Sequence, residues 1–138
     1  MHNLEAVVFA QGCTEIERMV QIMGGTRAFA YGLPGAGDLF VTVQGGRSMR
    51  MGRLLGLGHT YAEAREIMAE ETLEAAEIVR VLGEALPKLT GRGIVEPEDF
   101  PYLRALAQVI VLGRPADRLL TPISETTIRI FSGSSPFW

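Results

Sequence analysis

The spacing of apolar residues constrains this fold most, because wherever it is clear it has the period of a helix. The clearest stripe recurs every three or four residues: Leu103, Leu106, Ala107, Ile110 and Val111. A second stripe predicts a helix over residues 73–86: Ala75, Ile78, Val79, Leu82 and Leu86. No segment alternates apolar and polar residues as a half-buried strand does, and no internal repeat is present. The sequence therefore predicts an all-α fold.

Glycine, proline and capping residues divide the rest of the chain. Residues 4–23 predict a helix whose first half, AVVFA, is apolar all round and is expected to lie buried between neighbours. Residues 31–38 predict a turn or loop, and residues 39–43 could form a strand or a helix. Residues 47–55 predict a helix ended by glycines.

Further boundaries follow in the second half. Thr60 and Glu63 form a capping box that opens a helix through about residue 69. Pro97 suits the first turn of the helix that Gly113 and Pro115 end, and Thr121 with Pro122 begins a last helix through residue 131. We expect one helical domain over residues 3–131 and a loose tail over residues 132–138.

Length and charge exclude several classes of protein. The chain has 138 residues, enough for one cored domain but not for a nucleotide domain together with a substrate domain. No apolar run is long enough to cross a bilayer and no signal peptide opens the chain. The net charge of −3 gives no indication of a nucleic-acid partner, and the single cysteine, Cys13, suits a reducing, cytoplasmic setting.

Familiar chemical motifs are missing. The sequence has no GxGxxG dinucleotide loop and no Walker-type phosphate loop. His2 and His59 are isolated, so no metal site is predicted, and Cys13 is expected to be a packed thiol. The acidic run that contains Glu71 is more typical of a solvated helix face than of a ligand site.

Residues 32–52, GLPGAGDLFVTVQGGRSMRMG, are the best candidate for a binding site. Glycines let the backbone approach a ligand closely, and the loop delivers the carboxylate of Asp38. Gly45 and Gly46 lead into a helix that starts with Arg47, where backbone N–H groups and the guanidinium favour an anion. A small phosphorylated polyol would suit both features. A plain glycine-rich turn beside a surface arginine is the alternative that the residues alone leave open.

This segment resembles the C-terminal, substrate-binding domain of NAD(P)-dependent glycerol-3-phosphate dehydrogenase. GLPGAGDLFVT matches the family loop G-x-x-G-x-(G/A)-D-L with its following threonine, and GGRSMRMG matches the family G-G/S-R-N segment. NLEAVVFAQGCTEIERM, LEAAEIVRVL and GIVEPEDFPYLRALAQVIVLGRP resemble family helices, so the likeness covers residues 3 to about 120. The resemblance implies the helical fold of the 6-phosphogluconate dehydrogenase C-terminal domain.

The resemblance also implies roles for individual residues. Asp38 matches the aspartate that binds the substrate hydroxyls, and Thr42 a threonine of the same pocket. Arg47 matches the arginine that holds the substrate phosphate and reaches the cofactor, and Glu71 matches the Glu or Gln that touches the dinucleotide. Ser48 stands where the family usually has asparagine, so that contact loses an amide donor.

The family interconverts sn-glycerol 3-phosphate and dihydroxyacetone phosphate with NAD or NADP. Its cofactor is held by an N-terminal Rossmann domain, and its general acid–base lysine lies on a helix before the counterpart of Asn3. Lys88, the only lysine here, matches nothing in that motif. We therefore expect a fragment that carries no catalytic residue and is inactive alone. We also expect the protein to form a homo-oligomer.

Two other functions stay open at this point. One is a catalytically silent helical assembly module whose apolar first helix drives self-association. The other is the C-terminal domain of a different two-domain hydroxy-acid dehydrogenase. The Gly-Gly-Arg segment argues against this second interpretation, because it suits a phosphate and hydroxy-acid substrates often lack one.

Overall fold

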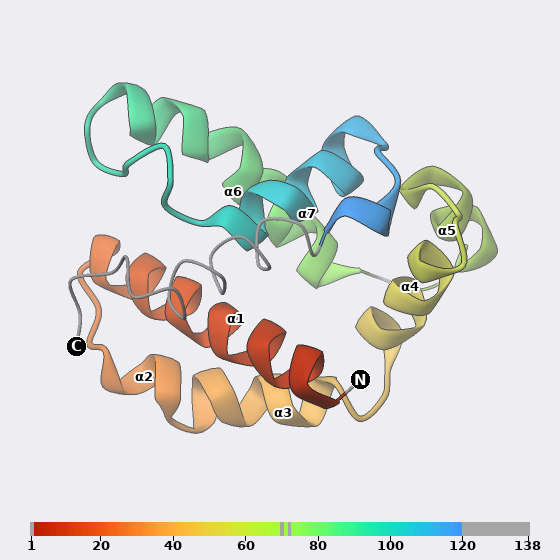
Figure 1. Cartoon of the computed structure of the whole chain (residues 1–138), viewed down its shortest axis with the longest axis horizontal. Coiled ribbons are helices and arrows are strands. Elements are labelled where there is room, and N and C mark those ends of the chain that lie inside the picture. The colour runs from red at the N-terminus through yellow and green to blue at the C-terminus, as the bar shows by residue number, and fades with distance from the viewer. Residues whose placement is uncertain (1, 70, 72, 120–138) are drawn as a thin grey trace.

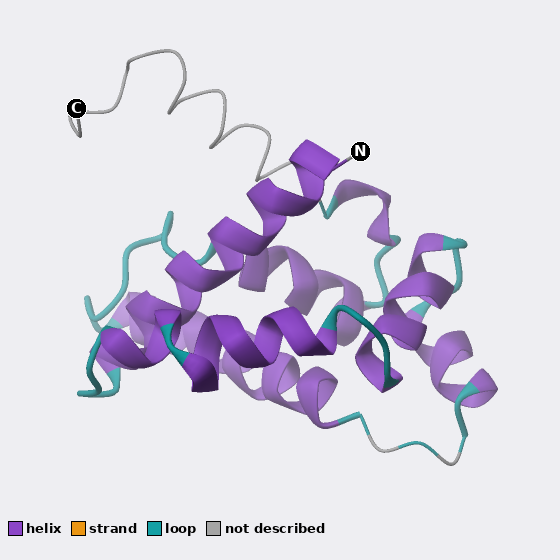
Figure 2. Ribbon diagram, turned by 90° about the horizontal axis from the view of Figure 1, so that it is seen from below, coloured by secondary structure: helices purple, strands orange, loops and turns teal. Residues whose placement is uncertain are grey.

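A long first helix organises the fold. The computed structural model of the chain describes residues 2–69, 71 and 73–119. Helix α1 (His2–Ile22) comes first, and α2 (Ala28–Tyr31), the π-helical turn η1 (Leu33–Gly37) and α3 (Asp38–Thr42) then run back along it (Figure 1). The described residues form helices and loops without a strand (Figure 2), which confirms the all-α prediction for this part of the chain.

The second half forms two pairs of helices. Helix α4 (Arg47–Gly56) packs against α5 (Tyr61–Ile67), and α6 (Glu74–Gly91) packs against α7 (Pro101–Leu112). A short 3-10 helix, η2 (Ala116–Arg118), then contacts both α4 and α7. Within the described residues, no helix combines the length and the apolar character that crossing a bilayer requires.

Two apolar clusters form the core. The larger joins α4, α5, α6 and α7 through the side chains of Met51, Leu55, Ala64, Met68, Leu73, Ala76 and Val109. The smaller consists of Leu86, Val95 and Phe100, against which Met19 and Ile22 of α1 pack. Burial of these side chains ties the sequence-distant helices together, because each removes apolar surface from water.

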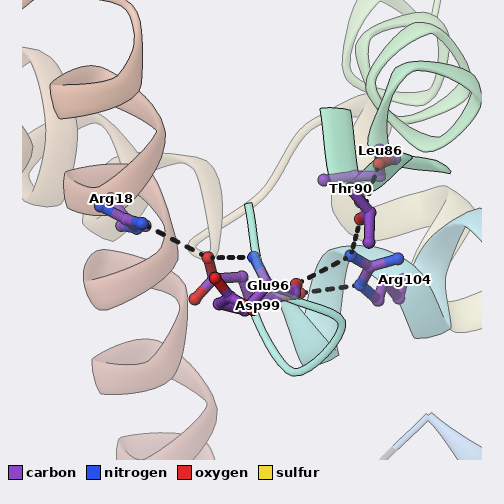
Figure 3. A network of polar contacts seen from close by, with 6 residues as sticks. All are labelled: Arg18, Leu86, Thr90, Glu96, Asp99 and Arg104. Carbon is purple, nitrogen blue, oxygen red and sulfur yellow. Dashed lines mark hydrogen bonds and ion pairs between the residues drawn. The ribbon is translucent and has the colours of Figure 1, made fainter. Parts of the chain in front are cut away.

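A polar network reinforces the smaller cluster (Figure 3). Arg18 of α1 pairs with Asp99 at 3.4 Å, and the same carboxylate accepts from the N–H of Glu96 at 3.0 Å. Arg104 of α7 donates to the carbonyl of Asp99 at 2.8 Å and to Thr90 Oγ1 at 3.1 Å. The connection between α6 and α7 is thereby fixed to α1.

Residues 31–38, predicted to be a turn or loop, are helical instead. The N–H of Gly37 donates to the carbonyl of Gly32 at 3.1 Å, which closes a π-type turn that leads directly into α3. Glycine is required inside this turn, because a Cβ on Gly35 would lie 2.1 Å from the carbonyl oxygen of Ala30. Gly and Pro ordinarily interrupt helices, so the local pattern could not reveal this close packing.

Some signals in the local sequence were correct, and others misplaced the ends of helices. The capping box is confirmed: the Glu63 N–H donates to Thr60 Oγ1 at 3.3 Å, and the Thr60 N–H donates to the Glu63 carboxylate at 2.8 Å. Helix α6 extends past the predicted end at Leu86 to Gly91, and α7 begins at Pro101 rather than near Pro97. The predicted last helix (residues 122–131) and tail (132–138) lie outside the described residues.

Two predictions of burial were wrong. On α6, Ala75 and Ile78 are exposed, while Ala76 is buried. On α1, Ala6 and Ala10 are exposed, since among the described residues α2, η1 and α7 contact this helix without surrounding it. The helical period was correct in both cases, and only the side that faces a neighbour was misjudged.

Candidate functional site

Asp38 and Thr42 occupy the two ends of α3. Asp38 is exposed in the first turn, and Thr42 is half-buried at the last position. Because they lie four residues apart, their side chains share one face of the helix. Leu39 of the same short helix lies close to Gly12 of α1, since a Cβ added to Gly12 would lie 3.7 Å from Leu39 Cδ2. Packing on α1 therefore holds a carboxylate and a hydroxyl in a fixed relation.

The N-terminus of α4 provides backbone donors. Gly46 precedes the helix with a φ of 94°, a left-handed conformation that favours glycine. The first turn closes when the N–H of Arg50 donates to the carbonyl of Gly46 at 3.1 Å. The N–H groups of the first helical turn come before that bond and have no carbonyl one turn back within the helix, and the glycine before them has no side chain that could act as a cap. Together with the helix dipole, these donors favour an anion.

Arg47 and Ser48 stand at this helix start. Both side chains are exposed, and Arg47 is the first residue of α4. A guanidinium can bind a phosphate through two parallel hydrogen bonds, and a serine hydroxyl can donate one more. The α4 N-terminus therefore combines backbone N–H groups with side chains suited to the same anion.

Glu71 lies beside α4, although it follows α5 in the chain. Its carboxylate forms an ion pair with Arg50, one helical turn after Arg47, and its N–H donates to the carbonyl of Met68 at 2.8 Å. Its side chain is 28% exposed, so solvent and ligands can still reach it. Glu71 is thus a held residue rather than a member of a freely solvated face, whereas Glu74 and Glu77 are exposed.

No role for Arg50 was predicted from the sequence. Its position three residues after Arg47 places both on one side of α4, which is the only sequence signal for it. Its partner is 21 residues away, and a separation of that size leaves no local pattern.

The two halves of the site are joined by a short connection, residues 43–46. Five residue steps separate Thr42 from Arg47, so their Cα atoms lie within about 17 Å of each other. The Gly45 N–H donates to the Thr42 carbonyl at 3.4 Å, which turns the chain between the helices. A hydroxyl-binding group and an anion-binding group therefore sit at either end of one four-residue link.

The surface cavities, Cys13 and the acidic side chains are weaker candidates for a functional site. Surface cavities of about 410 and 400 Å³ lie along α7, and neither is lined by a predicted site residue. Cys13 is buried, and burial raises the pKa of its thiol, so it is a packed side chain rather than an activated nucleophile. The part of the chain that the structure describes has no group of three or more His, Cys, Asp or Glu side chains suited to a metal ion.

Comparisons with known proteins agree on one family. The sequence model described as NAD-dependent glycerol-3-phosphate dehydrogenase C-terminus matches residues 1–121. A relative from Archaeoglobus fulgidus, NADP(+)-dependent glycerol-3-phosphate dehydrogenase, is 41% identical over 66 residues, which cover 48% of this chain and 20% of the relative.

Bacterial relatives give a similar result. A Bacillus cereus glycerol-3-phosphate dehydrogenase [NAD(P)+] is 43% identical over 68 residues, again 48% of this chain and 20% of the relative. The corresponding Bacillus thuringiensis protein is 41% identical over 68 residues, with the same coverage. The chain thus spans about a fifth of the length of the curated relatives it matches. No solved structure matches it.

Proposed function

Since the chain belongs to the family of NAD-dependent glycerol-3-phosphate dehydrogenase C-terminal domains, we propose that it forms the substrate-binding part of such an enzyme. The enzyme would interconvert sn-glycerol 3-phosphate and dihydroxyacetone phosphate. The observation that carries the proposal is the arrangement of Asp38 and Thr42 on α3 and of Arg47 at the start of α4, joined by four residues. The chemistry of this arrangement matches a ligand that has both hydroxyls and a phosphate.

The phosphate would bind at the N-terminus of α4. Its oxygens would accept hydrogen bonds from the backbone N–H groups that Gly46 leaves uncapped and from the Arg47 guanidinium. Ser48 would add a hydroxyl donor, which is shorter than the asparagine amide usual in the family. The dianionic charge would be neutralised by one arginine and by the positive end of the helix dipole.

The carbon chain of the substrate would extend toward α3. The Asp38 carboxylate only accepts hydrogen bonds when ionised, so it would select for hydroxyl donors. The Thr42 hydroxyl, on the same face, can donate or accept, and so can bind either a hydroxyl or a carbonyl oxygen. Asp38 would also repel a second phosphate, which favours a ligand with one anionic end.

The dinucleotide would contact the same helix from the side of Glu71. A partly exposed carboxylate that Arg50 holds in place can accept hydrogen bonds from ribose hydroxyls, and Arg47 lies one turn away. NAD(P), when bound, supplies the hydride chemistry of the family. The residues of this chain would bind and orient the two ligands against each other.

The experiment is calorimetric titration of the 138-residue chain with glycerol 3-phosphate. Arg47→Ala should weaken binding by about tenfold to a hundredfold, because a charge-assisted hydrogen bond contributes roughly 1.5–3 kcal/mol. Arg53→Ala removes the same charge from an exposed position in the last turn of α4 and should leave the affinity unchanged. Equal affinity in wild type and Arg47→Ala would refute the role of Arg47.

Asp38→Asn separates the two halves of the site. It should weaken binding of glycerol 3-phosphate and leave binding of inorganic phosphate unaltered, because only the former has hydroxyls. Arg47→Ala should weaken both ligands. If Asp38→Asn weakens neither ligand, then Asp38 does not face the substrate.

A further inference from the structure

Glu17 of α1 holds both ends of α2 with a single carboxylate. The side chain of Glu17 is only 10% exposed, and its Oε1 forms an ion pair with Arg27, the residue before the first turn of α2. Its Oε2 accepts a hydrogen bond at 2.5 Å from the hydroxyl of Tyr31, the last residue of α2. This hydrogen bond, with burial as a smaller cause, raises the pKa of the Tyr31 phenol, so the hydroxyl keeps the proton that it donates.

Helix α2 depends on such contacts because it is very short. It has four residues, and a helix of that length is not stabilised by its own hydrogen bonds. Its cap residue, Arg27, makes no side-chain hydrogen bond to the first turn. Ala30 is fully buried on one side of the helix, and Glu17 ties down its two ends. Contacts with α1, along which α2 lies (Figure 1), therefore set where this helix sits.

The position of α2 is passed on to Asp38 without a flexible spacer. Only Gly32 lies between α2 and the π-helical turn η1, and its carbonyl accepts from the N–H of Gly37 at 3.1 Å. The turn packs tightly on α2, since a Cβ on Gly35 would lie 2.1 Å from the carbonyl oxygen of Ala30. The N–H of Asp38 in turn donates to carbonyls of η1. A shift of α2 would therefore shift Asp38.

The two halves of the candidate site rest on different supports. The hydroxyl-binding half, Asp38 and Thr42 on α3, follows η1 and lies along α1. The phosphate-binding half, Arg47 at the start of α4, belongs to a helix that packs through Met51 and Leu55 into the larger apolar cluster. In the part of the chain that the structure describes, that cluster contains no residue of α1. A change on α1 can therefore affect one half and spare the other.

We propose that Glu17 is a positioning residue for the hydroxyl-binding half of the site. Through Arg27 and Tyr31 it fixes α2, and through α2 it sets where the Asp38 carboxylate lies. The inference rests on the proposed function, because it gives Glu17 a role in the same site. Glu17 touches no ligand itself, so its effect is on selectivity: it matters for a ligand that has hydroxyls and not for phosphate alone.

Amide hydrogen exchange of the ¹⁵N-labelled chain tests the link to the turn without any ligand. Glu17→Gln leaves one acceptor oxygen in place of two and removes the charge, so it can satisfy only one end of α2. Exchange should then become about tenfold faster at the N–H groups of Gly35 and Gly37, which are bonded within the turn. Tyr31→Phe removes only the hydroxyl of a half-exposed side chain and should act in the same direction.

Glu15→Gln is the matched control, because Glu15 is an equally buried carboxylate on the same helix. Its oxygens accept from the N–H groups of Tyr102 at 2.8 Å and Leu103 at 2.9 Å, at the start of α7. This variant should speed exchange at those two groups and leave Gly35 and Gly37 unchanged. Circular dichroism shows that each variant is folded, and Tyr31→Phe carries the test if Glu17→Gln does not fold.

Calorimetric titration then tests selectivity. Glu17→Gln and Tyr31→Phe should each weaken binding of glycerol 3-phosphate about threefold to tenfold, and binding of inorganic phosphate should stay within about twofold of wild type. Removing a negative charge would by itself strengthen anion binding, so a loss in Glu17→Gln cannot be a charge effect. Glu15→Gln makes the same change in charge and should weaken neither ligand. The double variant of Glu17→Gln and Tyr31→Phe should bind about as Glu17→Gln does, because both changes break one contact.

Two results would overturn the proposal. One is unchanged exchange at Gly35 and Gly37 in Glu17→Gln. The other is an equal loss of affinity for glycerol 3-phosphate and inorganic phosphate, which would show that Glu17 supports the whole fold rather than the Asp38 half. Faster exchange at these glycines in a protein whose wild type does not bind glycerol 3-phosphate would support the link from Glu17 to the turn and refute the proposed function instead.

Discussion

Glu15 connects α1 to the start of α7, and its removal should be among the most destabilising changes to a polar residue of the chain. Its side chain is buried, with 9% of the residue exposed. One carboxylate oxygen accepts from the backbone N–H of Tyr102 at 2.8 Å and the other from that of Leu103 at 2.9 Å. Phe100, at the cap position of α7, has a φ of 62° and provides no side-chain acceptor. A residue 87 positions away thus caps this helix.

The magnitude follows from these bonds. A hydrogen bond to a charged group contributes about 1.5–3 kcal/mol, and Glu15→Ala removes two of them from partly buried backbone donors. Water that enters the space left by the side chain recovers part of this, so we expect a loss of about 3 kcal/mol. Glu15→Gln keeps one acceptor but turns an NH₂ group toward the other donor, and should cost about 2 kcal/mol.

Urea titration followed by circular dichroism measures both losses. Glu66→Ala, on the exposed surface of α5, is the matched control and should change the free energy of unfolding by less than about 0.5 kcal/mol. The reasoning fails if Glu15→Ala is no less stable than Glu66→Ala, or if Glu15→Gln is less stable than Glu15→Ala.

Two further predictions concern packing and pH. Gly35→Ala should lower the free energy of unfolding by about 2 kcal/mol or more and also weaken glycerol 3-phosphate binding, because its Cβ would force the turn before Asp38 away from α2. Gly52→Ala is the control: its Cβ would have open space around it, so it should be neutral or stabilising in the same urea titration. Burial raises the pKa of Cys13 from 9.0, and burial together with the Glu15 carboxylate raises the pKa of Tyr102 from 10.0. The folded state therefore holds these protons more tightly than the unfolded state, so the free energy of unfolding is highest below about pH 9 and falls as the pH rises further. Urea titrations from about pH 8 to 11 should show this decline. A Tyr102→Phe variant whose free energy of unfolding falls as steeply as that of wild type would contradict the assignment to Tyr102.

The sequence predicted the parts of the fold that short-range chemistry decides. The capping box at Thr60 and the glycine before Arg47 depend on residues within one turn, and both are found in the structure. The family resemblance, carried by the Asp38 loop and the Gly-Gly-Arg segment, is confirmed by the family match over residues 1–121.

Tertiary contacts decided the rest. The turn around Gly35 is helical because it packs on the Ala30 carbonyl, and a rule that glycine and proline break helices could not anticipate that contact. The buried side of α6 depends on where α7 crosses it, and the ion pair of Glu71 with Arg50 spans 21 residues. The roles of Asp38, Thr42, Arg47, Ser48 and Glu71 in binding stay predictions.

Amide chemical shifts of the ¹⁵N-labelled chain during titration with glycerol 3-phosphate test the central claim most directly. A phosphate at the start of α4 should shift the N–H signals of Gly46, Arg47 and Ser48 most, and those of Asp38 and Thr42 next. Glycerol should not shift the α4 signals, and Arg47→Ala should reduce the response to glycerol 3-phosphate. Shifts confined to the α7 cavity around Gln108 and Arg114, or no shift at about 10 mM ligand, would contradict a substrate site on this chain.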